Sequence, residues 1–127
     1  MNGVDAAEVI VDLLQRGHAV EFRVRGDSMH PAIREHDLVH VAPSRDVRVN
    51  DVVLALAERG LTAHRVIAVD GESVVTRGDN TTAADRALAR DRILGKVVWV
   101  ERNGARRAPF REGAVLRVLR RLRRALR

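Results

Sequence analysis

The feature that most constrains this chain is a series of short apolar segments separated by tight turn signals. In the first of them Val20, Phe22 and Val24 alternate with charged residues, which is typical of a half-buried β-strand. Signals such as Asp70-Gly71 join successive segments into hairpins. Short strands joined in this way predict a small, curled, mainly antiparallel β domain. The predicted strands are residues 20–24, 38–42, 52–57, 61–69, 73–76 and 95–101.

Helices are predicted only at the two ends of the chain. Residues 4–15 carry their apolar side chains mainly on one face, and Gly17 is a natural stop. Residues 111–127 have an apolar stripe of Val and Leu beside seven arginines, which is the pattern of a basic amphipathic helix. Residues 79–91 form a polar excursion of loop or helix type. We therefore expect one β domain at residues 1–110, which includes the first helix, followed by the amphipathic helix.

The excess of positive charge is confined to the end of the chain. The net charge is +6, yet residues 1–110 contain 16 basic and 16 acidic side chains, whereas residues 111–127 contain seven arginines and one acid. The alternatives are a helix on anionic lipid or on a partner, and a helix that packs its apolar stripe on its own domain. We favour the membrane surface or a partner, because so many arginines exceed what solubility requires. Nucleic acid is disfavoured, because the segment has no aromatic residue for stacking and no helix-turn-helix precedes it.

Length and composition exclude several classes of protein. The 127 residues suffice for one modest core, and the absence of cysteine excludes disulfides, thiolate zinc sites and a cysteine nucleophile. No apolar run approaches the roughly 20 residues of a membrane helix, and the N-terminus carries acids rather than the basic region of a secretory signal. The histidines lack metal-ligand spacing, so we expect no metal and no cofactor. The predicted location is the cytoplasm, with the arginine-rich segment as the means of peripheral contact with the inner membrane face.

Ser28 is the most conspicuous candidate for a nucleophile, because it lies in a Gly-Asp-Ser turn directly after the first predicted strand. A nucleophilic hydroxyl needs a rigid exposed turn and nearby N–H groups for the oxyanion. Its base would be His64, in the middle of a predicted strand, since histidine titrates near neutral pH. Asp79 or Asp85 would then hold the imidazole in the right tautomer. Each residue alone also has an ordinary structural interpretation: a turn serine, a satisfied strand histidine and an Asx turn at Asp79.

Short motifs connect these residues along the chain. They are Gly26-Asp27-Ser28-Met29-His30-Pro31, His36-Asp37-Leu38-Val39, Asn50-Asp51-Val52-Val53, His64-Arg65-Val66, Gly78-Asp79-Asn80 with Asp85, and Gly95-Lys96-Val97. In this order and spacing they resemble the signal peptidase I superfamily, which also includes the self-cleaving domains of SOS-response repressors. The resemblance covers residues 20–102 and implies the mainly β fold of that superfamily.

The residue at the base position distinguishes the branches of this superfamily. Bacterial signal peptidases and the repressors pair the serine with a lysine. The only lysine here, Lys96, falls in the closing motif, and His64 stands at the base position. The chain therefore resembles the serine–histidine branch, which includes the endoplasmic-reticulum and archaeal signal peptidases and a sporulation-type bacterial one. The resemblance implies a serine endopeptidase that processes a peptide or protein precursor.

The resemblance also implies roles for individual residues. Ser28 attacks, His64 is the general base, and Asp85 orients the imidazole with support from Asp79. Many signal peptidases have a hydroxyl donor two residues before the serine, where this chain has Gly26, so the oxyanion hole would rely on backbone N–H groups such as that of Ser28. The implied contacts with substrate are Gly26, Met29 and Pro31.

Other departures from the superfamily bear on how the chain works. His36-Asp37 and Asn50-Asp51 replace the usual Gly-Asp pairs, and both are expected in turn conformations. The sequence lacks the membrane anchor of signal peptidases and resembles small soluble members instead. The alternative to an enzyme is a catalytically inactive peptidase-like binding module. It would hold a peptide by strand addition and dock to a membrane or a partner through the arginine-rich helix.

Overall fold

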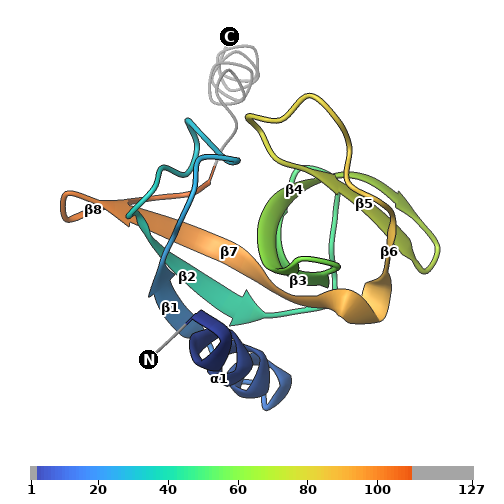
Figure 1. Cartoon of the computed structure of the whole chain (residues 1–127), viewed down its shortest axis with the longest axis horizontal. Helices are drawn as coiled ribbons and strands as arrows, with labels where there is room; N and C mark the ends of the chain where they lie inside the picture. Colours follow the sequence, from blue (N-terminus) through green and yellow to red (C-terminus); the bar gives the residue numbers. More distant parts are fainter. Residues whose placement is uncertain (1–2, 110–127) are drawn as a thin grey trace, which may run out of the picture.

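The computed structural model describes residues 3–109, which form one curved antiparallel sheet with an α-helix packed against it (Figure 1). The predicted mainly β fold is thus confirmed. No helix among residues 3–109 has both the length and the apolar composition needed to cross a bilayer. In chain order the elements are α1 (Gly3–Gln15), β1 (Val20–Arg23), β2 (Leu38–Pro43), β3 (Val52–Ala57), β4 (Gly60–Asp70), β5 (Ser73–Arg77), β6 (Leu88–Ala89), the 3₁₀ turn η1 (Arg90–Arg92), β7 (Ile93–Arg102) and β8 (Ala105–Arg107).

Strand β7 lies inside the sheet, between β2 and β3. The strand order is β1-β2-β7-β3-β4-β5-β6, and β8 pairs with the C-terminal end of β7. The register of β2 against β7 shifts between His40 and Val41, and that of β3 against β7 shifts between Leu54 and Ala55. Bulges of this kind increase bending and twist. Figure 1 shows the result, since β3, β4 and β5 curl away from the plane of β1 and β2.

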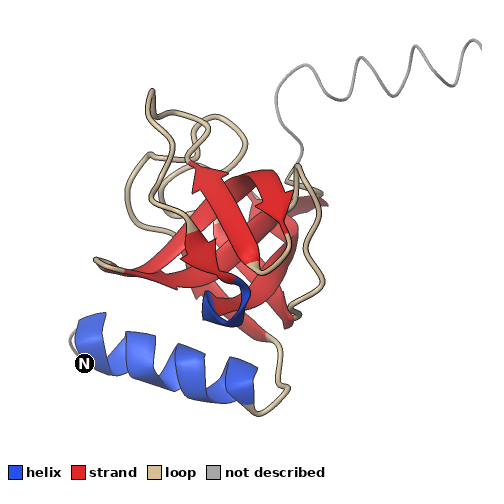
Figure 2. Cartoon of the chain, turned by 90° about the vertical axis from the view of Figure 1, so that its right-hand side faces the viewer, coloured by secondary structure: helices blue, strands red, loops and turns tan. Residues whose placement is uncertain are grey.

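The curl divides the apolar core into two clusters. One lies between α1 and the strands β1, β2 and β7, where Leu14 of the helix is 3% exposed. Figure 2 shows α1 lying across this end of the sheet. The other cluster lies inside the curl and contains Val53, Val66 and Val74, which are fully buried. Because side chains alternate across a strand, β3 sends Leu54 to the first cluster and Val53 to the second.

The helix and the strands predicted from the sequence are confirmed within a few residues at each end. Strands β6 and β8 are not among the strands predicted from the sequence. The first is a two-residue strand that closes the polar excursion at residues 79–91 onto β5. The second is exposed throughout and forms because Asn103 and Gly104, with φ angles of 52° and 79°, return the chain along β7. The predicted helix at residues 111–127, and with it the predicted division of the chain, lies outside the described residues.

The two Asp-containing turns before β2 and β3 adopt the expected conformations. The φ angle is 74° at His36 and 83° at Asn50, in the left-handed region that glycine populates most easily. The following residues, Asp37 and Asp51, each accept the backbone N–H of the residue three positions earlier, at 2.8 Å in both turns. These hydrogen bonds fix the chain where β2 and β3 begin.

Asp37 also links the start of β2 to the end of β7. Its carboxylate is buried and accepts hydrogen bonds from Arg102 Nε at 2.9 Å and from Arg102 Nη2 at 2.6 Å. Burial by itself raises the pKa of the Asp37 carboxyl. The hydrogen bonds from Arg102 and from the Arg34 N–H outweigh burial, so the pKa lies below its usual value. The same pairing raises the pKa of Arg102.

Candidate active site

Ser28 lies in the loop between β1 and β2, which is closed at its base by two hydrogen bonds. The Val24 N–H donates to the Asp37 carbonyl at 2.9 Å, and the His36 N–H donates to the Val24 carbonyl at 2.8 Å. Within the loop Gly26 has a φ angle of 84°, which residues with a side chain rarely adopt. The loop therefore presents Ser28 from a fixed base, and its bend requires glycine.

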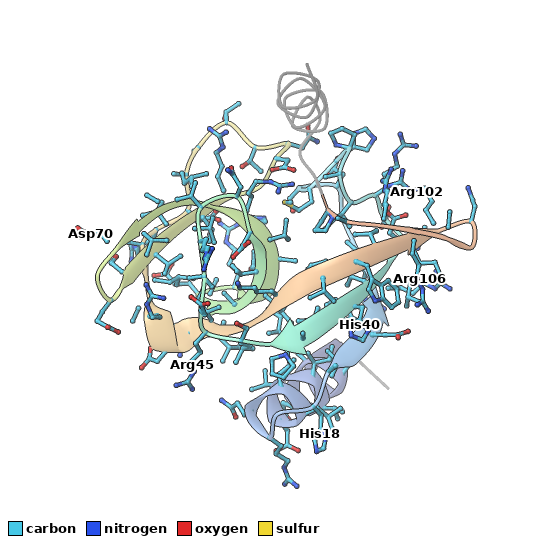
Figure 3. The ribbon with its side chains drawn as sticks, turned by 180° about the vertical axis from the view of Figure 1, so that it is seen from behind. His18, His40, Arg45, Asp70, Arg102 and Arg106 are labelled. Carbon is cyan, nitrogen blue, oxygen red and sulfur yellow. The ribbon has the colours of Figure 1, made fainter. Side chains whose placement is uncertain are left out.

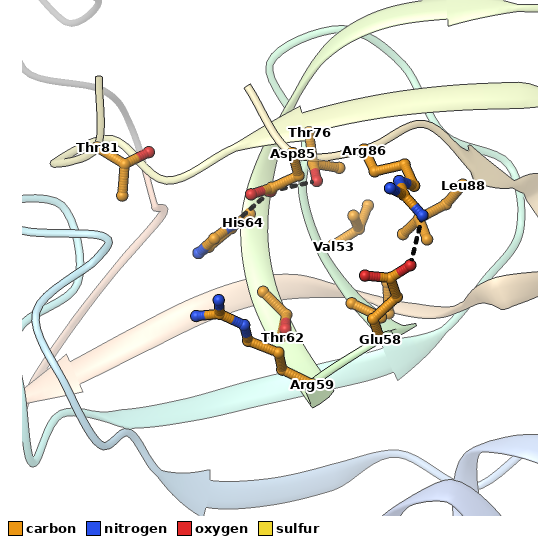
Figure 4. Close-up of a pocket in the computed structure, with 12 residues that line it drawn as sticks. Val53, Glu58, Arg59, Thr62, His64, Thr76, Thr81, Asp85, Arg86 and Leu88 are labelled. Atoms are coloured by element: carbon orange, nitrogen blue, oxygen red, sulfur yellow. Dashed lines mark hydrogen bonds and ion pairs between the residues drawn. The ribbon is translucent and has the colours of Figure 1, made fainter. Parts of the chain in front are cut away.

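His64 of β4 meets Ser28 across the fold. The His64 Nε2 lies 3.1 Å from Ser28 Oγ, and the His64 Nδ1 lies 2.5 Å from Asp85 Oδ2. Thr76 of β5 donates its hydroxyl to the same carboxylate oxygen at 2.8 Å (Figure 4). Because a carboxylate only accepts hydrogen bonds, the ring proton belongs on Nδ1 and the Nε2 lone pair faces the serine hydroxyl. The imidazole is 12% exposed, so it is sheltered and still reached from solvent.

Asp79 has a different partner. Arg65 donates from Nε to Asp79 Oδ1 at 2.9 Å and from Nη2 to Asp79 Oδ2 at 2.8 Å. The two side chains are only 3% and 5% exposed. Arg65 follows His64 on β4, so strand alternation sends it to the opposite face. The sequence does not decide whether Asp79 or Asp85 orients the imidazole. In the structure Asp85 is hydrogen-bonded to the imidazole, whereas Asp79 is paired with the buried Arg65.

Arg65 joins three segments of chain beneath the site. Besides its pairing with Asp79, it donates from Nη1 to the Asn50 carbonyl at 2.8 Å and from Nη2 to the Pro109 carbonyl at 2.9 Å. It thus connects β4 to the turn before β3, to the segment after β5 and to the segment after β8. In the sequence Arg65 stands out only as part of the His64-Arg65-Val66 motif. The signal that identifies it is a charged residue at an inward-facing strand position, which requires a buried partner.

The segment after β5 packs directly on the serine loop. A Cβ atom on Gly78 would lie 2.6 Å from the Ser28 carbonyl oxygen and 3.2 Å from His64 Nε2. The Asn80 N–H donates to the same Ser28 carbonyl at 2.8 Å. Glycine at position 78 therefore allows the loop and the imidazole to approach each other, a role that its place in the Gly78-Asp79-Asn80 motif does not by itself indicate.

The three residues implied as substrate contacts lie in different surroundings. Gly26 is exposed and Pro31 is partly exposed, both in the loop that carries Ser28. Met29 is 3% exposed in the first apolar cluster, and its Sδ accepts the Asp79 N–H at 3.4 Å. Its side chain thus anchors the loop in the core, and its contact with a substrate stays a prediction.

Another histidine, His40, and the lysine have partners elsewhere in the fold, and His18 is exposed. Figure 3 shows His18 at the end of α1 and His40 on β2. The His40 ring stacks on Trp99 with the ring centroids 4.8 Å apart. Lys96 pairs with Asp51, with Nζ lying 3.0 Å from Oδ2. These contacts give structural roles to His40 and Lys96.

Two cavities flank the β3–β4 hairpin. The first, called the groove here, measures about 990 Å³ and lies between α1, β1 and one face of the hairpin. The second, called the pocket, measures about 390 Å³ and lies between the other face and residues 81–88. His64 and Asp85 line the pocket (Figure 4). The imidazole therefore borders a cavity of a size that holds ligands in other proteins, roughly 300–1,000 Å³.

Comparison with known proteins shows similarity to a protein family. A family model described as Peptidase S24-like matches residues 4–98 of the chain. A search of curated proteins found no match. The matched residues include Ser28, His64 and Asp85, and they extend from α1 into β7.

Proposed function

Because the chain belongs to the Peptidase S24-like family, we propose that it is a serine endopeptidase in which Ser28 is the nucleophile and His64 the general base. The observation that carries this proposal is the 3.1 Å separation between Ser28 Oγ and His64 Nε2, with Nδ1 held by Asp85. Nucleophile, base and orienting acid are the parts that acyl transfer to a serine requires.

In the proposed reaction, His64 takes the proton of the Ser28 hydroxyl while Oγ bonds to the carbonyl carbon of the scissile peptide. The C–N bond then breaks, the proton passes from Nε2 to the leaving amine, and the acyl group stays on Ser28. A water molecule, deprotonated by the same nitrogen, hydrolyses the ester. Asp85 stabilises the imidazolium at each stage, and Thr76 holds Asp85 in place.

The groove supports an extended peptide as the substrate. Within residues 3–109, β1 pairs only with β2, and residues 60–64 of β4 pair only with β3. Each strand thus has an edge with free backbone groups. Both edges border the groove, where Phe22, Leu54 and Leu61 supply apolar surface. A peptide that adds to these edges as a strand would run toward Ser28 at the end of one and His64 at the end of the other.

We further assign the chain to the serine–histidine branch, which includes the endoplasmic-reticulum and archaeal signal peptidases, and its substrates to peptide or protein precursors. His64 at the base position supports this assignment. Lys96 supports it as well, because its Nζ pairs with Asp51 at 3.0 Å. A lysine held in an ion pair with a carboxylate is not poised to deprotonate a serine.

Labelling by a fluorophosphonate, which reacts with activated serines, and cleavage of a peptide mixture test the proposal. Ser28→Ala should abolish both, and His64→Ala should lower kcat/KM by about 10²–10⁴-fold, the range of a lost general base. The matched controls Ser44→Ala and His18→Ala should leave both unchanged. A fully active His64→Ala protein at neutral pH would remove the assigned base. A wild type that binds peptides but neither cleaves them nor is labelled would favour the inactive binding module.

The charge of residues 111–127 supports a second proposal, that this segment holds the protein on anionic lipid. Each basic residue near such a surface contributes roughly 1 kcal/mol, and the segment has seven arginines and one acid. The full chain should sediment with vesicles that contain phosphatidylglycerol and stay in solution with phosphatidylcholine alone. Replacing Arg120, Arg121 and Arg124 by alanine should weaken the sedimentation. Equal sedimentation with both vesicles, or with neither, would contradict an electrostatic membrane contact.

A further inference from the structure

The β3–β4 hairpin is the wall between the groove and the pocket. Side chains alternate across both strands, so successive residues line opposite cavities. The groove face of the hairpin consists of Leu54, Leu56, Leu61 and Ala63, and the pocket face of Val53, Ala55, Ala57, Thr62 and His64. The imidazole therefore belongs to the face that is turned away from the groove.

The pocket is lined by His64, whose Nε2 faces Ser28. A Cβ atom on Gly78 would lie 3.2 Å from His64 Nε2 and 3.0 Å from Thr81 Cγ2, so these two groups border the same point. Both residues line the pocket, which extends from there to Leu88 on β6 (Figure 4). The pocket thus borders the imidazole that acts as the base in the proposed reaction.

The chemistry of the base indicates which part of a substrate lies at this place. After the attack, His64 has to return the proton to the nitrogen of the leaving segment, so this segment passes the imidazole. The acyl half of the substrate stays bonded to Ser28, on the side of the β1 and β4 edges that border the groove. We infer that the pocket binds an apolar side chain of the substrate segment that follows the scissile bond. This inference rests on the proposed function.

The composition of the pocket fits such a side chain. Val53, Ala55 and Leu88 supply apolar surface, and the volume of about 390 Å³ accommodates a large aliphatic or aromatic group. At the rim, Arg86 Nη1 pairs with Glu58 Oε1 at 2.7 Å, and both side chains are more than two-thirds exposed. A pair so exposed to water is weak and leaves the apolar interior free. The substrates should therefore carry Leu, Val, Met or Phe within the first few positions after the cut.

Paired substitutions on the two faces of the hairpin test the inference. Ala57→Leu fills the pocket, and Ala63→Leu adds the same atoms to the groove face, both at partly exposed positions. The probe is a mixture of synthetic peptides whose cut sites and rates are read by mass spectrometry. Ala57→Leu should lower kcat/KM for peptides with an apolar residue after the cut by at least about tenfold relative to those with glycine there, the scale of a misfit in an apolar pocket. Ala63→Leu should change only the preference for substrate residues that precede the scissile bond.

A second variant and a separate readout keep the inference distinct from the proposed function. Leu88→Ala enlarges the pocket and should shift the preference after the cut toward Phe and Trp. Fluorophosphonate labelling reports the Ser28 nucleophile without use of the pocket. If the protein is labelled and cleaves peptides, but selection after the cut is absent or is altered by neither Ala57→Leu nor Leu88→Ala, the inference is wrong and the proposed function stands. If the wild type shows neither labelling nor cleavage, both are wrong.

Discussion

Asp85 and Asp79 have different partners and should therefore respond differently to the same substitution. In Asp85→Asn the charge that accepts the His64 Nδ1–H is lost, so kcat/KM should fall by about 10²–10⁴-fold with little change in the free energy of unfolding. In Asp79→Asn the buried Arg65 loses its counter-charge, so the free energy of unfolding should fall by roughly 3–5 kcal/mol. Urea unfolding and peptide cleavage of both variants check this. Equal losses of activity per folded molecule would contradict the separation of roles.

Gly78 and Gly26 are required for different physical reasons, which alanine substitutions should distinguish. A Cβ at Gly78 would press on the Ser28 carbonyl at 2.6 Å, whereas one at Gly26 meets nothing within 4 Å. Gly78→Ala should slow labelling of Ser28 by about 10²-fold, the cost of misplacing a reacting group by roughly 1 Å. Gly26→Ala should cost about 1–2 kcal/mol of stability through its positive φ. Labelling rates and unfolding curves of the two proteins provide the measurement, and a Gly78→Ala protein labelled at the wild-type rate would refute the packing argument.

At the residue scale, the sequence identifies side chains whose chemistry is distinctive and misses those whose role depends on a partner. Ser28 stands out as a rare serine in a turn, and His64 as a histidine at a strand position. Thr76 and Arg65 act through groups on other segments, and no spacing along the chain shows that Thr76 faces an aspartate. Met29 lies one position after the nucleophile. In a turn, a shift of one residue decides whether a side chain points into the core or toward the active site, and Met29 points into the core.

At the scale of elements, strands with several alternating residues could be predicted, because their periodicity reflects their own burial. The strand at residues 52–57 is predicted with the bounds that the structure has. The strands β6 and β8 have two and three residues. Segments so short show no period, and they form because β5 and β7 offer them backbone partners. Their existence follows from the sheet and not from their own sequence.

The link between β2 and β7 through Asp37 should make the free energy of unfolding depend on pH in the acidic range. The pKa of Asp37 lies below its ordinary value, which is about 3.9. The contribution of the Asp37 carboxylate to the free energy of unfolding is therefore complete above that value. It is lost as the pH falls through the lower pKa of the folded state. Asp37→Asn should lower the free energy of unfolding near neutral pH by roughly 1.5–3 kcal/mol, and the difference from wild type should shrink below about pH 3. Urea unfolding at both pH values measures it, and a constant difference would exclude the charge as its cause.

At the scale of the whole molecule, the site exists because the sheet curls. Ser28 follows β1 at one end of the strand order, whereas His64 lies on β4 and Asp85 follows β5 near the other end. In a flat sheet these strands would be separated by the widths of β2, β7 and β3. The bulges on both sides of β7 bend the sheet instead. Nothing in the local sequence specifies such bulges, so the residues alone could not show that the two side chains meet, and only the family resemblance implied it.

Gly95 is the position where the two halves of the sheet meet on β7, and it should couple stability to the site. A Cβ there would lie 2.5 Å from the Ala42 carbonyl oxygen and 2.8 Å from Val41 Cγ1, so Gly95→Ala has to displace β2 from β7. We expect a loss of roughly 1–3 kcal/mol in the free energy of unfolding, as in other overpacked sites, and slower labelling of Ser28, because the spacing between the serine loop and β4 depends on this crossing. Gly104→Ala, in the exposed turn between β7 and β8, should cost about 1–2 kcal/mol through its positive φ and leave labelling unchanged. If Gly95→Ala lost stability but kept the wild-type labelling rate, the site would be independent of the crossing at β7.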